Sequence, residues 1–203
     1  MPNASWKEVI QKAYESKIDL QVQDMVTSDD TVRYPYKVFG VSLAEVEIDV
    51  LTGEYEILRV DITEDVGRSV SPEIDIGQVE GAFIMGLGYW TSEKLRYDKN
   101  TGELLTNRTW NYQIPICTDI PQDFRVYLRK NSFSYEAIQG AKVVGEPPLC
   151  LSVAVALAIR EALSQARLES NIPTTEWFSI DGPSSVEAVG LSSATEIKDL
   201  KLN

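Results

Sequence analysis

The chain has 203 residues, of which 43% are hydrophobic, and this is enough apolar material to build one large globular domain or two small ones. Its formal net charge of −12 repels nucleic acid phosphates and anionic membrane surfaces, so neither class of partner is expected. The absence of histidine excludes histidine-based zinc sites, Ser-His-Asp triads and Cys-His dyads, which leaves proton transfer to carboxylate, lysine or tyrosine. Two cysteines, Cys117 and Cys150, are too few for a disulfide framework and indicate the cytoplasm.

The N-terminal segment predicts a short amphipathic helix. Ser5 is placed to cap it, and Glu8 follows three residues later. Apolar residues recur at helical spacing behind the cap, namely Trp6, Val9, Ile10 and Ala13. The polar, aperiodic stretch over residues 20–34 then predicts a surface loop.

Residues 38–67 predict a β-hairpin whose turn is Thr52-Gly53. Apolar and polar residues alternate with period two on both sides of that turn. Alternation alone places the acidic residues Glu45 and Glu47 on a solvated face, so we expect no metal ligands among them. The pattern therefore predicts an antiparallel sheet with one side in water.

A helix of about 15 residues is predicted to start at Pro72, behind Ser71 as cap, and to end near the stretch GLGYWT. Gly77 and Gly81 share one face of this helix, and each costs about 1 kcal/mol relative to alanine. Either another backbone packs tightly there or a ligand approaches closely. Gln78 lies in the same neighbourhood, as a structural amide or as a ligand contact.

The second half of the chain contains weaker strand signals and one strong helix signal. Lys99 to Gly102 predicts the turn of a second hairpin, and DFRVYLRKN at 123–131 predicts a further strand. The residues after Leu149 are apolar nearly all round, which predicts a buried core helix that is too short to span a membrane. Together the patterns predict an α+β fold, with an antiparallel or mixed sheet and hairpins packed on two long buried helices.

Glu146 stands in the sequence GEPP, where the two prolines fit the first turn of the core helix. One interpretation is that Glu146 only caps that helix. The other is that it is a general base on a rigid support, with Gly145 permitting the close approach of a substrate or cofactor.

The stretches DIGQVEGAFIMGLGYWTSEKLRYD and AKVVGEPPLCLSVAVALAIREAL, with FGVSLAEVEIDVLTGEYEILRVDITEDVG upstream of them, resemble the molybdenum hydroxylases. This is the family of xanthine dehydrogenase and aldehyde oxidase, and the resemblance covers residues 5–168 in one collinear order. GLGYWTSEKLRYD and NRTWNYQIPICTDIP look most like aldehyde oxidases of insects.

The resemblance implies roles for four residues. Glu146 matches the family's catalytic base and would take a proton at the molybdenum centre, while Gln78 matches a glutamine that donates to a molybdenum oxo or pterin group. Val144 and Gly145 match positions at the molybdopterin. No residue of the chain is expected to bind the metal directly, because the cofactor, molybdenum-molybdopterin, carries it.

The resemblance also implies further cofactors, a homodimeric assembly and a longer full-length protein. Full-length members are homodimers that contain FAD and two [2Fe-2S] clusters, whose modules are missing from these residues. We therefore expect a fragment, with residues 1–168 in the C-terminal portion of the molybdopterin-binding domain and residues 169–203 as a tail that covers the surface or frays. The expected substrate is an aldehyde, oxidised to a carboxylic acid. The alternatives are an N-heterocycle, hydroxylated as by xanthine dehydrogenase, or no turnover in a truncated binding or structural module.

Overall fold

The computed structural model describes residues 4–23, 37–132, 140–180 and 182–195, which belong to two units, 1–34 and 35–203. In the first unit, α1 (Trp6–Glu15) has the predicted capping box: Ser5 Oγ accepts from the Glu8 amide at 3.4 Å, and the Ser5 amide donates to the Glu8 carboxylate at 2.7 Å. The predicted loop over residues 20–34 lies mostly outside the described residues.

The predicted hairpin is confirmed in the second unit, where β1 (Gly40–Ile48) pairs antiparallel with β2 (Tyr55–Glu64). Its turn closes through hydrogen bonds from the Gly53 amide to the Asp49 carbonyl and from the Asp49 amide to the Glu54 carbonyl, both 2.8 Å. Gly53 has φ +80°, a conformation that glycine adopts without strain. Glu45 and Glu47 are exposed, as the alternation predicts.

A third strand, β3 (Asp123–Leu128), confirms the strand predicted at 123–131 and lies beside β2 in parallel, giving a mixed sheet in the order β1-β2-β3. Charged side chains line this parallel pair. Arg59 Nε is 2.6 Å from Asp61 Oδ2, and Arg125 binds Asp123 at 2.6 Å. Such exposed pairs contribute about 0–1 kcal/mol each, so apolar burial on the opposite face must stabilise the sheet.

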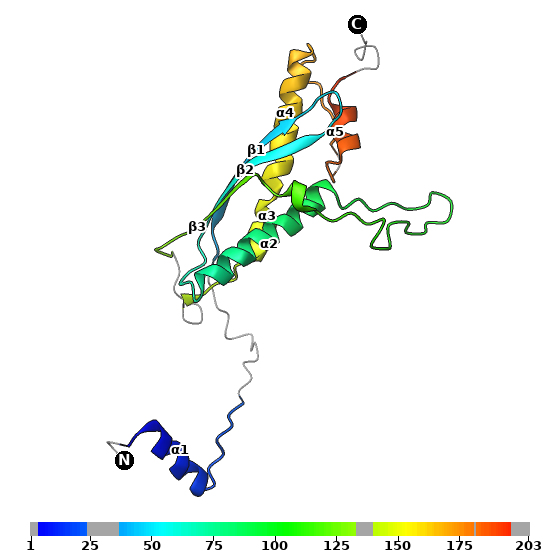
Figure 1. The fold of residues 1–203 in the computed structure, drawn as a ribbon. Helices are drawn as coiled ribbons and strands as arrows, with labels where there is room; N and C mark the ends of the chain where they lie inside the picture. Colours follow the sequence, from blue (N-terminus) through cyan, green and yellow to red (C-terminus); the bar gives the residue numbers. More distant parts are fainter. Residues whose placement is uncertain (1–3, 24–36, 133–139, 181, 196–203) are drawn as a thin grey trace. The chain divides into compact units, whose positions relative to one another are not determined.

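The helix α2 (Pro72–Thr91) has 20 residues and is longer than predicted, because it continues through the stretch GLGYWT. Gly86, near the end of α2, packs closely against another helical segment. A side chain at Gly86 would collide with the Leu149 carbonyl and the Ser152 hydroxyl, so this glycine lets the backbone of the next helical segment approach α2. Figure 1 shows α2 running beside α3 and α4.

The predicted core helix is interrupted, since α3 (Glu146–Leu151) and α4 (Val153–Glu169) meet at Ser152. The prediction that this helix is buried on all sides is wrong, because Ile159 is fully buried whereas Leu157 is 60% exposed. The prediction that this helix is too short to span a membrane is wrong, because the stretch 146–169 is long and apolar enough to cross one by length and composition alone. Its buried face nevertheless packs against the sheet, with Ser42 Oγ donating to the Leu151 carbonyl at 2.8 Å.

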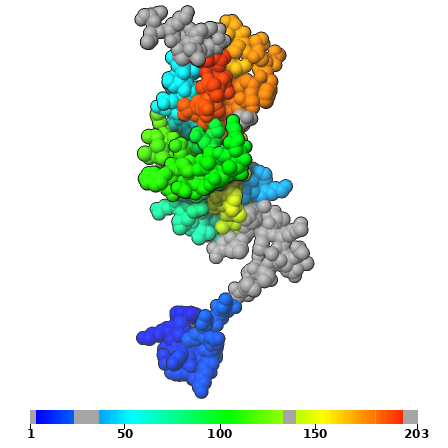
Figure 2. All heavy atoms as spheres, turned by 90° about the vertical axis from the view of Figure 1, so that its right-hand side faces the viewer, coloured from blue at the N-terminus to red at the C-terminus, as the bar shows by residue number. Residues whose placement is uncertain are grey.

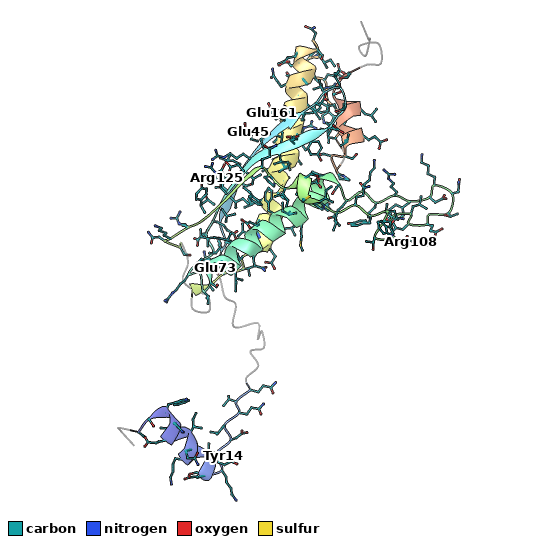
Figure 3. All side chains as sticks on the ribbon, in the orientation of Figure 1. Tyr14, Glu45, Glu73, Arg108, Arg125 and Glu161 are labelled. Atoms are coloured by element: carbon teal, nitrogen blue, oxygen red, sulfur yellow. The ribbon has the colours of Figure 1, made fainter. Side chains whose placement is uncertain are left out.

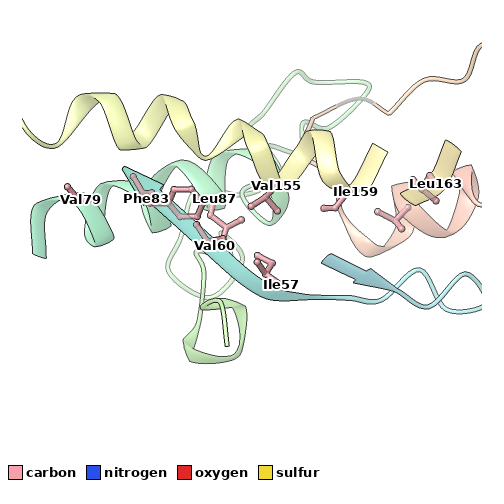
Figure 4. Packing of buried hydrophobic residues seen from close by; sticks show 10 residues of the cluster. Ile57, Val60, Val79, Phe83, Leu87, Val155, Ile159 and Leu163 are labelled. Carbon is pink, nitrogen blue, oxygen red and sulfur yellow. The ribbon is translucent and has the colours of Figure 1, made fainter. Parts of the chain in front are cut away.

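The core lies between the helices and one face of the sheet (Figure 4). Buried side chains from β2, α2, α4 and α5 form it. These are Ile57, Val60, Ile62, Val79, Phe83, Leu87, Val155, Ile159, Leu163 and Val189. The observed fold is therefore α+β, as predicted, with a single apolar layer that supports both α2 and α3.

Two further segments complete the unit. The predicted turn at 99–102 forms, with Asp98 accepting from the amides of Asn100 and Thr101 at 2.8 Å. In place of two paired strands, its arms share one isolated bridge, Tyr97 to Leu104. The segment after residue 169 contains a helix that the sequence patterns did not predict, α5 (Val186–Ser192). Its Val189 is fully buried in the core.

Candidate functional site

Glu146 is the first residue of α3, and its side chain is exposed. Gly145 is the N-cap, Pro147 and Pro148 follow in the first turn, and Pro148 is buried. Within the described part of the chain, no hydrogen bond or ion pair engages the Glu146 carboxylate. The interpretation that Glu146 only caps its helix therefore lacks the expected hydrogen bond, and the carboxylate is available to another molecule.

Gln78 lies on α2 next to the residue that precedes Glu146. Its Oε1 is 3.7 Å from the position that a Cβ on Gly145 would occupy, and the Ala82 Cβ is 3.9 Å from the same position. Gln78 is exposed, so its amide is free to bind a ligand. The structure thus brings together two residues, Gln78 and Gly145, that are far apart in sequence. In Figure 2 the yellow segment that follows residue 140 adjoins the first half of α2.

The surface of α2 around Gln78 is open. A Cβ added to Gly77 or Gly81 would meet nothing within 4 Å among the described residues. Ile74 and Met85, one turn further out at either end, are 64% and 70% exposed. We call these five residues, Ile74, Gly77, Gln78, Gly81 and Met85, the open face of α2. Two explanations were open for Gly77 and Gly81. Tight packing of another backbone is wrong for the described residues, so the remaining explanation is the close approach of a ligand.

Val144 lies two residues before Glu146. Its side chain is half-buried and packs against the core. Gly145, which follows Val144, is half-buried and lies beside Gln78. All four residues singled out from the sequence therefore lie in one region, where α2 meets the start of α3. A separate hollow of about 370 Å³ beside α5 contains none of them.

Sequence reasoning missed a buried ion pair next to this region. Lys142 Nζ lies 3.2 Å from Asp65 Oδ1, and the two side chains are 0% and 1% exposed. The only sequence signal was a lone lysine within the apolar run AKVV, which by itself fits a surface position equally well.

Glu64, at the end of β2, is a second buried charge that the sequence did not reveal. Both of its carboxylate oxygens lack a hydrogen-bond partner among the described residues. Burial, with smaller contributions from the negative charges of Asp75 and Asp65, raises the pKa of Glu64 to about 7. Glu64 is therefore protonated more easily than an exposed glutamate.

The chain is similar in sequence to known proteins over most of its length. Residues 2–121 match the family described as "Molybdopterin cofactor-binding domain". The chain is 42% identical over 194 residues to a xanthine dehydrogenase/oxidase of Gallus gallus, covering 91% of this chain and 14% of that protein. It is 38% identical over 163 residues to an indole-3-acetaldehyde oxidase of Arabidopsis thaliana, covering 80% and 12%.

A solved structure shares the fold as well. Quinoline 2-oxidoreductase from Pseudomonas putida 86 superimposes with a TM-score of 0.62 at 28% identity, over 74% of this chain and 18% of that one. The chain thus spans only a small part of the length of its relatives. Because the family match covers more than half of the residues, the chain belongs to the molybdenum hydroxylase family, in its molybdopterin cofactor-binding domain.

Proposed function

We propose that this chain forms part of a molybdenum-dependent oxidoreductase that oxidises aldehydes to carboxylic acids with water as the oxygen source, and that Glu146 is its general base. One observation supports this most directly. Glu146 is exposed at the start of α3, has no hydrogen-bond or ion-pair partner among the described residues, and directly follows Gly145, which lies beside Gln78 of α2. A general base needs this combination of a free carboxylate and a rigid support.

The residues present fit molybdenum-molybdopterin. The two glycines of the open face have no described atom within 4 Å of an added Cβ, so the helix backbone is uncovered there, and the Gln78 amide can donate a hydrogen bond to an oxo or pterin oxygen. The backbone at Val144 and Gly145 would lie against the pterin. When bound, the cofactor would supply the two-electron oxidation and would acidify the oxygen nucleophile.

The chain's own residues would then perform three tasks. Glu146 would accept a proton at its carboxylate, which is possible without histidine because the acidified donor needs only a weak base. Gln78 would orient the cofactor, and the apolar packing of Val144 would keep the Gly145 backbone in place. FAD, two [2Fe-2S] clusters, a homodimeric assembly and a cytoplasmic location are further proposals for a longer polypeptide that contains these residues.

Hydroxylation of a purine is a second candidate, and one specific observation favours it. The identity to the Gallus gallus xanthine dehydrogenase/oxidase, 42%, exceeds the 38% identity to the plant indole-3-acetaldehyde oxidase, and it extends over more of the chain. Turnover of xanthine and of a panel of aliphatic and aromatic aldehydes by the molybdenum-loaded protein would distinguish these candidates.

The decisive experiment replaces Glu146 by glutamine in the molybdenum-loaded protein. Glu146→Gln removes the proton acceptor but keeps the shape of the side chain, so we expect normal molybdenum content and a loss of turnover of about 10²- to 10⁴-fold. Glu161→Gln is the matched control, because Glu161 is also an exposed glutamate on a helix, α4. Figure 3 shows Glu161 at the opposite end of the unit from Glu73, which lies in the first turn of α2. Unchanged turnover in Glu146→Gln, or an equal loss in Glu161→Gln, would refute the proposal.

A further inference from the structure

The chain segment that leads into Glu146 is attached to the segment that follows β2. Gly67 and Ala141 form an antiparallel bridge, the Arg68 amide donates to the Gly140 carbonyl at 2.7 Å, and the Lys142 amide donates to the Val66 carbonyl at 3.1 Å. Gly67 has φ +73°, and a side chain there would collide with the Gly140 carbonyl. The two segments therefore approach each other more closely than side chains would permit.

The buried pair of Asp65 and Lys142 lies inside this attachment. Lys142 Nζ is 3.2 Å from Asp65 Oδ1 and also donates to the Lys37 carbonyl at 2.8 Å. Asp65 Oδ1 accepts from the Gly67 amide at 3.1 Å, while the Asp65 amide donates to the Phe39 carbonyl at 2.8 Å. One ion pair thus ties together the chain before β1, the chain after β2 and the chain before α3.

Only three residues separate Lys142 from Glu146, and each end of this short connection is fixed. Lys142 is held by the ion pair, and Pro148 is buried in the first turn of α3. Val144, in the middle, packs against the core. Buried ion pairs contribute little net stability compared with apolar residues of the same size, so stability alone does not account for this pair. Its contacts with three chain segments suit it to fixing the position of the chain.

We propose that Asp65 and Lys142 are positioning residues for Glu146: their buried ion pair sets the path of residues 142–146 and thereby the place from which the carboxylate acts. This inference rests on the proposed function, since it assigns a purpose to the placement of Glu146. Neither residue is expected to touch substrate or cofactor.

The test compares Lys142→Met, Asp65→Asn and the double variant with Val189→Ala, a core substitution in α5 that lowers stability away from this segment. Each single variant in the pair is expected to lower kcat by about tenfold to a hundredfold, with KM changed by less than about threefold, because small displacements of a catalytic group have effects of this size. The double variant should be no worse than the poorer single variant, since both remove the same interaction. Val189→Ala should melt at a lower temperature yet keep its kcat.

A second readout does not depend on turnover. In the protein without cofactor, hydrogen exchange at the amides of residues 142–146 should accelerate at least about tenfold in Lys142→Met and remain unchanged in Val189→Ala. If Lys142→Met does not fold, the double variant is compared with Val189→Ala in its place, because the double variant leaves no buried charge unpaired.

The results separate the two proposals. If Lys142→Met melts early but keeps both its kcat and its slow exchange, the pair is merely structural and the inference fails, while the role of Glu146 stands. If Glu146→Gln keeps its turnover, the proposed function fails whatever the pair does. Loss of kcat in Lys142→Met that Val189→Ala reproduces at equal melting temperature would also overturn the inference.

Discussion

Gln78 and Gly145 lie side by side across the junction of α2 and α3, with the Gln78 Oε1 atom 3.7 Å from the position that a Cβ on Gly145 would occupy. This distance is an ordinary van der Waals separation, and Gly145 has φ −83°, which any residue adopts. Gly145→Ala should therefore fold normally, with a melting temperature within a few degrees of the parent. If the Gly145 backbone lies against the pterin, the added methyl should nevertheless reduce the molybdenum content. Equal molybdenum content in parent and variant would exclude Gly145 from the cofactor contact.

The open face of α2 allows a test in which stability and cofactor binding move in opposite directions. Gly77→Ala and Gly81→Ala place a methyl group in open space within a helix, so each should raise the free energy of unfolding by about 0.5–1 kcal/mol. The same methyl groups should lower molybdenum content if the cofactor occupies this face.

Gly86→Ala is the matched control for these two variants on the same helix. Its methyl group would collide with the Leu149 carbonyl and Ser152 hydroxyl, so it should lower the free energy of unfolding by about 1–3 kcal/mol. Denaturant titration together with metal analysis checks all three variants. Destabilisation by Gly77→Ala would show that another chain segment already fills the open face.

Glu64 should make the stability of the protein depend on pH. Burial, Asp75 and Asp65 raise its folded-state pKa from 4.5 to about 7, while Lys142 is engaged with Asp65. Because the folded state then holds the proton more tightly, the favourable contribution is complete below about pH 4.5 and is lost as the pH rises through 7.

Glu64→Gln removes this titration. At pH 8 the variant should be more stable than the parent by about 1–3 kcal/mol, and the difference should vanish toward pH 4.5. Denaturant titrations at several pH values measure it, with the exposed Glu47→Gln on β1 as control. A stability difference that does not change with pH would contradict this account of Glu64.

The one-sided burial of α4 gives a fourth prediction. Ile159 is fully buried against the core, whereas Leu157 is 60% exposed in the same helix. Ile159→Ala should lower the free energy of unfolding by about 2–5 kcal/mol and Leu157→Ala by less than about 0.5 kcal/mol. A large effect of Leu157→Ala in denaturant titration would indicate that a further surface covers this side of α4.

The elements that could be predicted from the sequence are those set by neighbouring residues. The capping box of Ser5 and Glu8 and the hairpin turn at Gly53 depend on hydrogen bonds within a few positions. The paired glycines, the isolated Glu146 and the resemblance of their surroundings to molybdenum hydroxylases are the signals from which the candidate site is predicted.

What could not be predicted depends on distant contacts. The continuation of α2 through Gly86 is stabilised by backbone from residues 149–152, and α5 is too short for a clear periodic pattern. The burial of Lys142 depends on Asp65, which lies far from it in sequence, so its pairing could not be read from local composition. Interactions of this kind appear only after the chain has folded.

The sheet order leaves β1 at an edge, and in the described part of the chain no further strand pairs with it. Unpaired edges can recruit strands from other molecules, and charged side chains are the usual protection against this. In β1 the charged residues Glu45 and Glu47 occupy only the second half of the strand. The first half has the apolar residues Val41 and Leu43, which are 59% and 69% exposed. The first half of β1 is therefore the place where self-association into intermolecular sheets would begin, and a lysine at position 43 should suppress such aggregation during purification.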